Sequence, residues 1–201
     1  MDIYKNGSSV AIIILHEIYG INQHIKYICD YYATQKYDVY CPNLFDANVS
    51  FKYTESEVAY SNFKENVGFH AFHNINELIH ELKNQYRKIF LIGFSVGATI
   101  AWRCSEHGKC DGVVGYYGSR IRNYTSVMPS CPTLLLFASQ DSFDVNDVID
   151  KLIKKENVSA QTLDGNHGFA DKYGGNYNEN SKIKAFEMAK TFIQSIEKSS
   201  E

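Results

Sequence analysis

A serine, an aspartate and a histidine occur in the order and setting that nucleophilic catalysis requires. Ser95 is the central residue of GFSVG (93–97), a G-x-S-x-G pentapeptide. A strand-like segment, KIFLI, precedes it, and a helix-prone segment, ATIAWRC, follows it. This strand–turn–helix setting exposes a serine hydroxyl on a sharp turn, and the flanking glycines avoid collisions with the crossing backbone. The alternative interpretation is a tight turn with a helix-capping serine.

A serine nucleophile needs a base, and the base needs a carboxylate that orients it. Asp141 lies just after the expected strand TLLLFAS, and His167 lies after the next expected strand, VSAQTL. With Ser95 they give the chain order serine, acid, histidine. Asp144 and Asp164 compete with Asp141 for the role of the acid. We expect Asp144 to cap the next helix and Asp164 to belong to the turn before His167.

The loop HEIYG (16–20) follows the first apolar segment, where the second amide of an oxyanion hole normally originates. The backbone N–H groups of Ile18 and Val96 are therefore the expected donors to a developing oxyanion. Glu17 is unusual because it puts a carboxylate close to a nucleophile. Its alternative role is structural, with the carboxylate accepting hydrogen bonds that order the loop.

These residues must be positioned by a sheet, and the rest of the sequence predicts one. Short apolar segments alternate with segments of helical periodicity, which is typical of a mostly parallel sheet with helices on both faces. The side chains after the strands then gather at one sheet edge. The expected strands are 10–15, 37–41, 88–92, 112–116, 133–139 and 158–163, and the expected helices are 22–36, 66–85, 98–106, 144–156 and 179–197.

Length and composition limit the function classes. The 201 residues suit a single α/β domain over 1–201, and a formal net charge of −3 gives no electrostatic attraction to nucleic acid or to an anionic membrane. The apolar run 10–15 is too short for a signal peptide or a membrane span. Five cysteines without a C-x-x-C pair predict free thiols and a cytoplasmic location. We interpret Cys104, His107 and Cys110 as packing residues, and the histidine stripe over 70–80 as a solvated helix face.

Together the quoted segments resemble the dienelactone hydrolase family of α/β-hydrolases. The matching segments are HEIYG (16–20), GFSVGA (93–98), YYGSR (116–120), ASQDSF (138–143) and NHGFAD (166–171). The resemblance spans almost the whole chain. It implies the α/β-hydrolase fold, a catalytic triad of Ser95, Asp141 and His167, and an auxiliary glutamate, Glu17.

Three departures from the family pattern bear on the substrate. Position 95 is serine, whereas the founding enzymes use a cysteine nucleophile. Those enzymes grip a carboxylate with arginines, but this chain has no arginine before Arg87 and has Asp171 where another is expected. We therefore expect neutral esters or lactones to be better substrates than anionic analogues, unless the fold brings Arg120, Arg122 or Lys172 to the site. The segment 45–65 leaves room for a small lid only, which predicts an open site.

The sequence thus predicts a hydrolase of ester, thioester or lactone bonds in a small molecule, without a metal or an organic cofactor. The expected substrate contacts are Tyr19, Tyr117, Arg120 and Phe169. Two alternatives stay open: a non-catalytic protein of the same fold that binds a small ligand, and a serine peptidase or acyltransferase. The oligomeric state is not fixed by the sequence, and a monomer is compatible with it.

Overall fold

The framework of the protein is a mixed β-sheet, seen in a computed structural model that describes residues 1–45, 49–107 and 109–199. The described strands follow the order β1-β3-β2-β4-β5-β6-β7. Neighbouring strands are parallel except β1 and β3, which are antiparallel. Their bounds are β1 Asp2–Tyr4, β2 Val10–Leu15, β3 Asp38–Cys41, β4 Lys88–Phe94, β5 Gly112–Tyr116, β6 Thr133–Gln140 and β7 Val158–Asn166.

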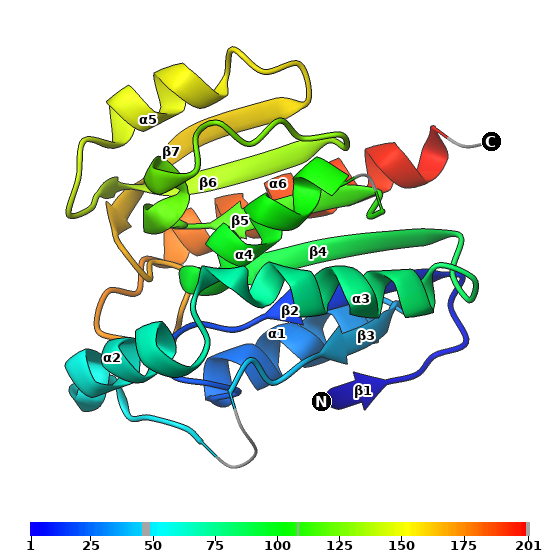
Figure 1. Cartoon of the computed structure of the whole chain (residues 1–201), viewed down its shortest axis with the longest axis horizontal. Helices are drawn as coiled ribbons and strands as arrows, with labels where there is room; N and C mark the ends of the chain where they lie inside the picture. The colour runs from blue at the N-terminus through cyan, green and yellow to red at the C-terminus, as the bar shows by residue number, and fades with distance from the viewer. Residues whose placement is uncertain (46–48, 108, 200–201) are drawn as a thin grey trace.

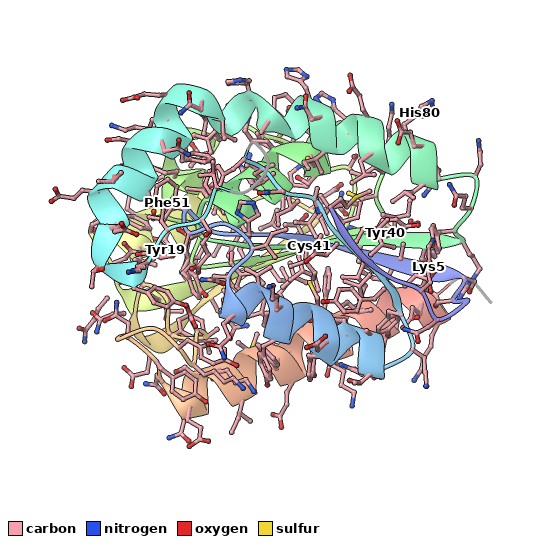
Figure 2. The ribbon with its side chains drawn as sticks, turned by 90° about the horizontal axis from the view of Figure 1, so that it is seen from below. Lys5, Tyr19, Tyr40, Cys41, Phe51 and His80 are labelled. Carbon is pink, nitrogen blue, oxygen red and sulfur yellow. The ribbon has the colours of Figure 1, made fainter. Side chains whose placement is uncertain are left out.

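Helices cover both faces of this sheet. Figure 1 shows α3 and α4 in front of the strands, and Figure 2 shows α1 and α6 together on the opposite side from α2 and α3. The helices are α1 Gln23–Thr34, α2 Ser56–Asn66, α3 Phe72–Leu82, α4 Val96–Cys104, α5 Val145–Leu152 and α6 Glu179–Lys198, with short 3-10 turns η1 Tyr53–Glu55, η2 Phe69–Ala71, η3 Ser105–His107 and η4 Ser119–Asn123. The predicted α/β architecture with helices on both faces is confirmed.

The central strands are buried on both faces, as their continuous apolar sequences indicate. Along β2, Ile12 and Ile14 pack into the cluster that contains the apolar stripes of α1 and α6. The intervening Ile13 and Leu15 pack into the cluster formed with α3 and α4. Because successive side chains of a strand alternate between faces, one strand joins the two cores.

The structure differs from the expected elements mainly before β4. The expected helix 66–85 begins at Phe72, because Gly68 has φ 63° and a 3-10 turn follows it. Residues 56–66 form a separate helix, α2, which occupies most of the second half of the segment 45–65, where we expected a small lid and assigned no helix. The three-residue edge strand β1 was not expected either. A strand this short carries too little periodicity to be recognised from sequence.

The parallel pairings place the ends of β2, β4, β6 and β7 at one edge of the sheet. The loop 16–20 leaves β2 at this edge, and α4 starts there directly after β4. In Figure 2, Tyr19 of that loop lies toward the opposite end of the molecule from Lys5. The segments predicted to do chemistry therefore meet at the carboxyl edge of the sheet, where ligands of such folds bind.

Candidate active site

Ser95 lies on a strained turn between β4 and α4. Its φ is 53° and its ψ is −112°, a conformation that side-chain-bearing residues adopt only where the surrounding structure holds it. A Cβ at Gly93 would lie 2.3 Å from the carbonyl oxygen of Gly97, and a Cβ at Gly97 would lie 2.3 Å from that of Leu15. Glycine is therefore required on both sides of Ser95, for the steric reason that the pentapeptide suggested.

Ser95, His167 and Asp141 form one chain of hydrogen bonds. Ser95 Oγ lies 2.9 Å from His167 Nε2, and His167 Nδ1 lies 2.8 Å from Asp141 Oδ2. A carboxylate only accepts hydrogen bonds, so Nδ1 carries the ring proton and Nε2 accepts from the serine hydroxyl. The ring is thus held in the tautomer that a general base needs.

The environment of Asp141 keeps its carboxylate ionised. Burial alone would raise the pKa of Asp141, but the hydrogen bond and charge of His167 and two hydrogen bonds from Ser142 outweigh it and hold the pKa below its usual value. The Ser142 amide and hydroxyl donate to Oδ1 over 2.7 and 3.2 Å. The second carboxylate oxygen is left for His167, so the acid is fixed from both sides.

The two rival acids have other positions. The Asp144 carboxylate caps α5 by accepting the Asp147 amide over 3.1 Å, as we expected from sequence. Asp164 is exposed within β7 rather than in the turn where we expected it, and its backbone carbonyl accepts the Ser181 hydroxyl over 2.6 Å. Among the described residues, the imidazole of the triad thus has a hydrogen bond to Asp141 and to neither rival.

Ile18 and Val96 border the same cavity as Ser95. Val96 is the first residue of α4, where backbone amides have no partner within the helix. The loop that carries Ile18 is ordered by His16, whose Nδ1 donates to the Glu17 carbonyl over 2.7 Å while Nε2 accepts the Leu44 amide over 2.8 Å. Burial lowers the pKa of His16 to about 4, so the ring is neutral and both bonds persist at physiological pH.

Two cavities adjoin the triad, and both are bordered by Ser95 and His167. The larger cavity has a volume of about 530 Å³ and is also lined by Tyr60 of α2 and Arg120 of η4. The Arg120 guanidinium lies 5.4 Å from the centre of the Tyr60 ring. An arginine therefore does reach the site. This is the exception that we named when we expected neutral substrates to be preferred over anionic ones.

The smaller cavity has a volume of about 300 Å³ and carries two buried carboxyl groups. Glu17 and Asp171 both line it, with exposed fractions of 5% and 2%. Burial, reinforced by the charge of Asp171, raises the pKa of Glu17 to about 7, although His167 and Tyr117 act in the opposite direction. Tyr19 and Tyr53 complete its aromatic wall.

Two of the four expected substrate contacts line the cavities, and the other two are buried in the protein interior. Tyr19 and Arg120 line the cavities, whereas Tyr117 and Phe169 have no exposed surface. Tyr117 packs against the His167 ring and Phe169 packs against Tyr117, so neither residue borders the space that a substrate would occupy. Their aromatic character suggested a pocket wall, but it reflects core packing at the end of the sheet.

Several lining residues were not predicted. Tyr53 and Tyr60 come from the segment 49–66, and Asn176 borders both cavities while its side-chain amide donates to the His167 carbonyl over 2.8 Å. No motif marks these positions, because loops and a short helix bring them to the site. Conversely, Arg122 and Lys172 lie over the rings of Phe143 and Tyr27 and border neither cavity.

The remaining candidate motifs are accounted for by packing. Cys104 is buried against α3, and Cys110 lies 3.6 Å from Cys131, sulfur to sulfur. Across residues 1–45, 49–107 and 109–199, no cluster of three or more His, Cys, Asp or Glu side chains is arranged to hold a metal ion. In that same part of the chain, every helix is too short or too polar to cross a membrane.

Comparison with known proteins agrees with this fold. A model of the dienelactone hydrolase family matches residues 3–197. The uncharacterized protein YczH of Bacillus subtilis is 37% identical over 187 residues, which cover 92% of each chain. Carboxymethylenebutenolidase 1 of Cupriavidus pinatubonensis is 19% identical over 86% of this chain and 80% of its own length.

Solved structures share the fold at low identity. The dienelactone hydrolase-like promiscuous phosphotriesterase P91, from metagenomic libraries, superposes with a TM-score of 0.72 at 14% identity, covering 94% of this chain and 87% of its own. The esterase Pf2001 of Pyrococcus furiosus gives a TM-score of 0.60 at 17% identity over 96% and 83% of the two chains. These likenesses establish the α/β-hydrolase fold.

Proposed function

Because the chain belongs to the dienelactone hydrolase family of α/β-hydrolases, we propose that it is a serine hydrolase that cleaves an ester, thioester or lactone bond of a small molecule. The family supplies the general activity, a hydrolase acting on a small substrate. The serine nucleophile and the type of bond are inferred from the site. The observation that carries the proposal is the hydrogen-bonded chain from Ser95 through His167 to Asp141.

The geometry supports acylation as the first step. The Ser95 hydroxyl attacks the substrate carbonyl carbon while Nε2 of His167 takes its proton. The carbonyl oxygen becomes an oxyanion. The amide of Ile18 and the amide of Val96, the first residue of α4, stabilise it. As the tetrahedral intermediate collapses, the imidazolium returns the proton to the leaving alcohol or thiol. Asp141 stays ionised and stabilises the imidazolium.

Deacylation repeats these steps with water. His167 takes a proton from water, the hydroxide equivalent attacks the acyl carbon, and Ser95 leaves with the proton that His167 returns. The larger cavity opens directly beside the triad and gives water and substrate access to the acyl group. Glu17 takes no part in these reaction steps, because histidine is the group that activates a serine.

Covalent labelling tests the nucleophile directly. A fluorophosphonate should form a stoichiometric adduct on the peptide that contains Ser95, and Ser95→Ala should neither be labelled nor hydrolyse 4-nitrophenyl butyrate. Asp144→Asn serves as the control, because Asp144 caps a helix and lies outside the hydrogen-bonded chain. Labelling that persists in Ser95→Ala would refute the assignment.

The same experiment separates the alternative functions. A non-catalytic binding protein would show no turnover of any activated ester, while a peptidase or acyltransferase would reveal itself by peptide cleavage or by transfer to an added alcohol.

We further propose a cytoplasmic location. It is supported by five buried cysteines that are free thiols, including Cys110 and Cys131, whose sulfurs are close but unbonded.

A further inference from the structure

The smaller cavity holds a carboxyl group that the proposed reaction does not use. Glu17 is 5% exposed and borders the cavity beside Ser95. In the described part of the chain, Glu17 accepts hydrogen bonds at its backbone carbonyl, from His16 and Gly20, but its carboxyl group receives none of normal geometry. The alternative role, in which this carboxylate orders its own loop, is therefore taken by His16. A buried carboxyl group without a donor is costly, so a ligand that supplies one is expected.

The neighbouring phenol does not fill this need. Tyr117 is fully buried beside Glu17, and its hydroxyl has no hydrogen-bond partner among the described residues. Burial raises the pKa of Tyr117, and the charge of Glu17 adds to the effect. The phenol thus leaves the Glu17 side chain at the border of the cavity, where a ligand can reach it.

A second carboxylate faces the same space. Asp171 is 2% exposed, accepts the Tyr53 hydroxyl over 2.5 Å and the Tyr173 amide over 2.9 Å, and still borders the cavity. Position 174 is glycine, and a Cβ there would lie 3.3 Å from Asp171 Oδ2. A side chain at that position would crowd this oxygen, so the glycine keeps it accessible.

Among the residues that the structure describes, no lysine or arginine lines the smaller cavity with these two carboxyl groups. His24 Nδ1 lies 3.6 Å from Asp171, but burial lowers the pKa of His24 to about 4, so this imidazole is neutral. The positive charge that the cavity favours must therefore come from a ligand.

The aromatic wall narrows the chemistry of that ligand. Tyr19 and Tyr53 border the cavity with their ring centres 4.8 Å apart, in an edge-to-face arrangement. Aromatic faces next to carboxylates are a setting that recognises ammonium groups, through cation–π attraction and charge pairing. A volume of about 300 Å³ is at the lower end for small-molecule sites. It suits one substituent of a substrate better than the whole molecule.

We propose that the smaller cavity is a subsite for an ammonium group of the substrate, held by Glu17 and Asp171 against Tyr19 and Tyr53. This inference rests on the proposed function, since it places the ammonium group on an ester, thioester or lactone whose carbonyl lies at Ser95. It names a substrate class, cationic esters, for a site at which the sequence led us to expect only that neutral substrates are preferred over anionic ones.

Matched pairs of esters test the proposal. Butyrylcholine is compared with 3,3-dimethylbutyl butyrate, and 4-nitrophenyl 4-(trimethylammonio)butanoate with 4-nitrophenyl 5,5-dimethylhexanoate. The members of each pair have the same shape and differ by one charge, which lies on the alcohol side in the first pair and on the acyl side in the second. The wild-type protein should favour the cationic member of at least one pair by about tenfold or more in kcat/KM.

Substitutions locate the source of that preference. Glu17→Gln and Asp171→Asn keep shape and hydrogen-bonding capacity but remove a negative charge, so each should lower the cationic-to-neutral ratio severalfold. Asp147→Asn removes the same charge from an exposed position on α5 and should leave the ratio unchanged. A wild-type ratio of one or less in both pairs, or a ratio unaffected by the two cavity variants, would overturn the proposal.

A binding measurement keeps this inference separate from the proposed function. Calorimetric titration of Ser95→Ala with tetramethylammonium chloride should show binding that Asp171→Asn weakens, with sodium chloride as the ionic-strength control. If no ester is hydrolysed but tetramethylammonium binds, the proposed function fails and the cation subsite stands. If neutral esters are hydrolysed and tetramethylammonium does not bind, the subsite fails alone.

Discussion

The two cavities that meet at Ser95 and His167 differ in charge and in how that charge is held. The larger cavity presents Arg120 from a 3-10 turn, half-buried beside Tyr60. The smaller cavity presents two carboxyl groups that are almost wholly buried. Water and salt screen an exposed charge, whereas a buried charge acts strongly on a ligand and also on the stability of the fold. The two cavities therefore share Ser95 and His167 but differ in the charge that they present to a ligand.

The largest effect should come from a residue that serves both cavities equally. Asp141→Asn keeps the size of the side chain but can hold His167 in the wrong tautomer, so kcat should fall by about 10⁴-fold, as in other triads. The loss should be the same for neutral and cationic esters, because the imidazole serves either substrate. Initial rates with one neutral and one cationic ester measure it.

Asp144→Asn is the matched control for that prediction. It replaces a carboxylate three residues away that caps α5, and it should cost at most about 1 kcal/mol of stability with kcat nearly unchanged. If Asp144→Asn lost more activity than Asp141→Asn, the triad acid would have to be reassigned. If Asp141→Asn impaired only one class of ester, the two cavities would not share a single reactive centre.

Ionisation of Glu17 in the smaller cavity should lower the stability of the folded protein. The pKa of Glu17 is raised to about 7 in the folded protein, so between its ordinary value and pH 7 the folded chain keeps a proton that the unfolded chain releases. Stability therefore falls as pH rises through this window, and the loss is complete above about pH 7. Glu17→Gln cannot ionise, so it should be more stable than the wild type at pH 8, by at most about 3 kcal/mol.

Urea unfolding at pH 4.5 and pH 8 measures this difference, which should disappear at the lower pH. Glu187→Gln, on the exposed face of α6, is the control and should change little at either pH. A Glu17→Gln protein that is less stable than the wild type at pH 8 would mean that the carboxylate is satisfied within the fold. That result would remove the reason for assigning it to a ligand.

The hydrogen-bonded chain of Ser95, His167 and Asp141 could be predicted from sequence because each residue directly follows a strand, and β4 and β6 are strongly apolar. Ser95, Asp141 and His167 are fixed by the strand ends and by the pentapeptide, whose glycines have a steric reason that sequence reveals. The parallel sheet was predictable for the same reason, since β2 and β4 are continuous apolar segments buried on both faces.

The cavity walls could not be predicted in the same way. Tyr53, Tyr60 and Asn176 come from loops or a short helix whose positions depend on tertiary contacts, such as the hydrogen bond from Tyr53 to Asp171 across 118 positions in the sequence. Arg120 was named as a candidate, but its place depended on how η4 follows β5. Tyr117 was named as a substrate contact, but it is fully buried and belongs to the core next to the site.

The smallest effect should come from Arg120, and it tests the larger cavity. The guanidinium is half-exposed, and no carboxylate of the described residues forms a salt bridge with it, so it is available to an anionic substituent. Exposed charge pairs are worth up to about 1 kcal/mol.

Arg120→Gln should therefore lower the kcat/KM ratio of an anionic to a neutral ester by about threefold to fivefold, less at high salt. The 4-nitrophenyl esters of monomethyl and free glutaric acid, measured at two ionic strengths, provide the ratio. Arg122→Gln is the control, because Arg122 lies over Phe143 and borders neither cavity. If the ratio is unchanged in Arg120→Gln while wild type still favours the neutral ester, the acidic cavity alone sets the charge preference, as the sequence suggested before the fold was known.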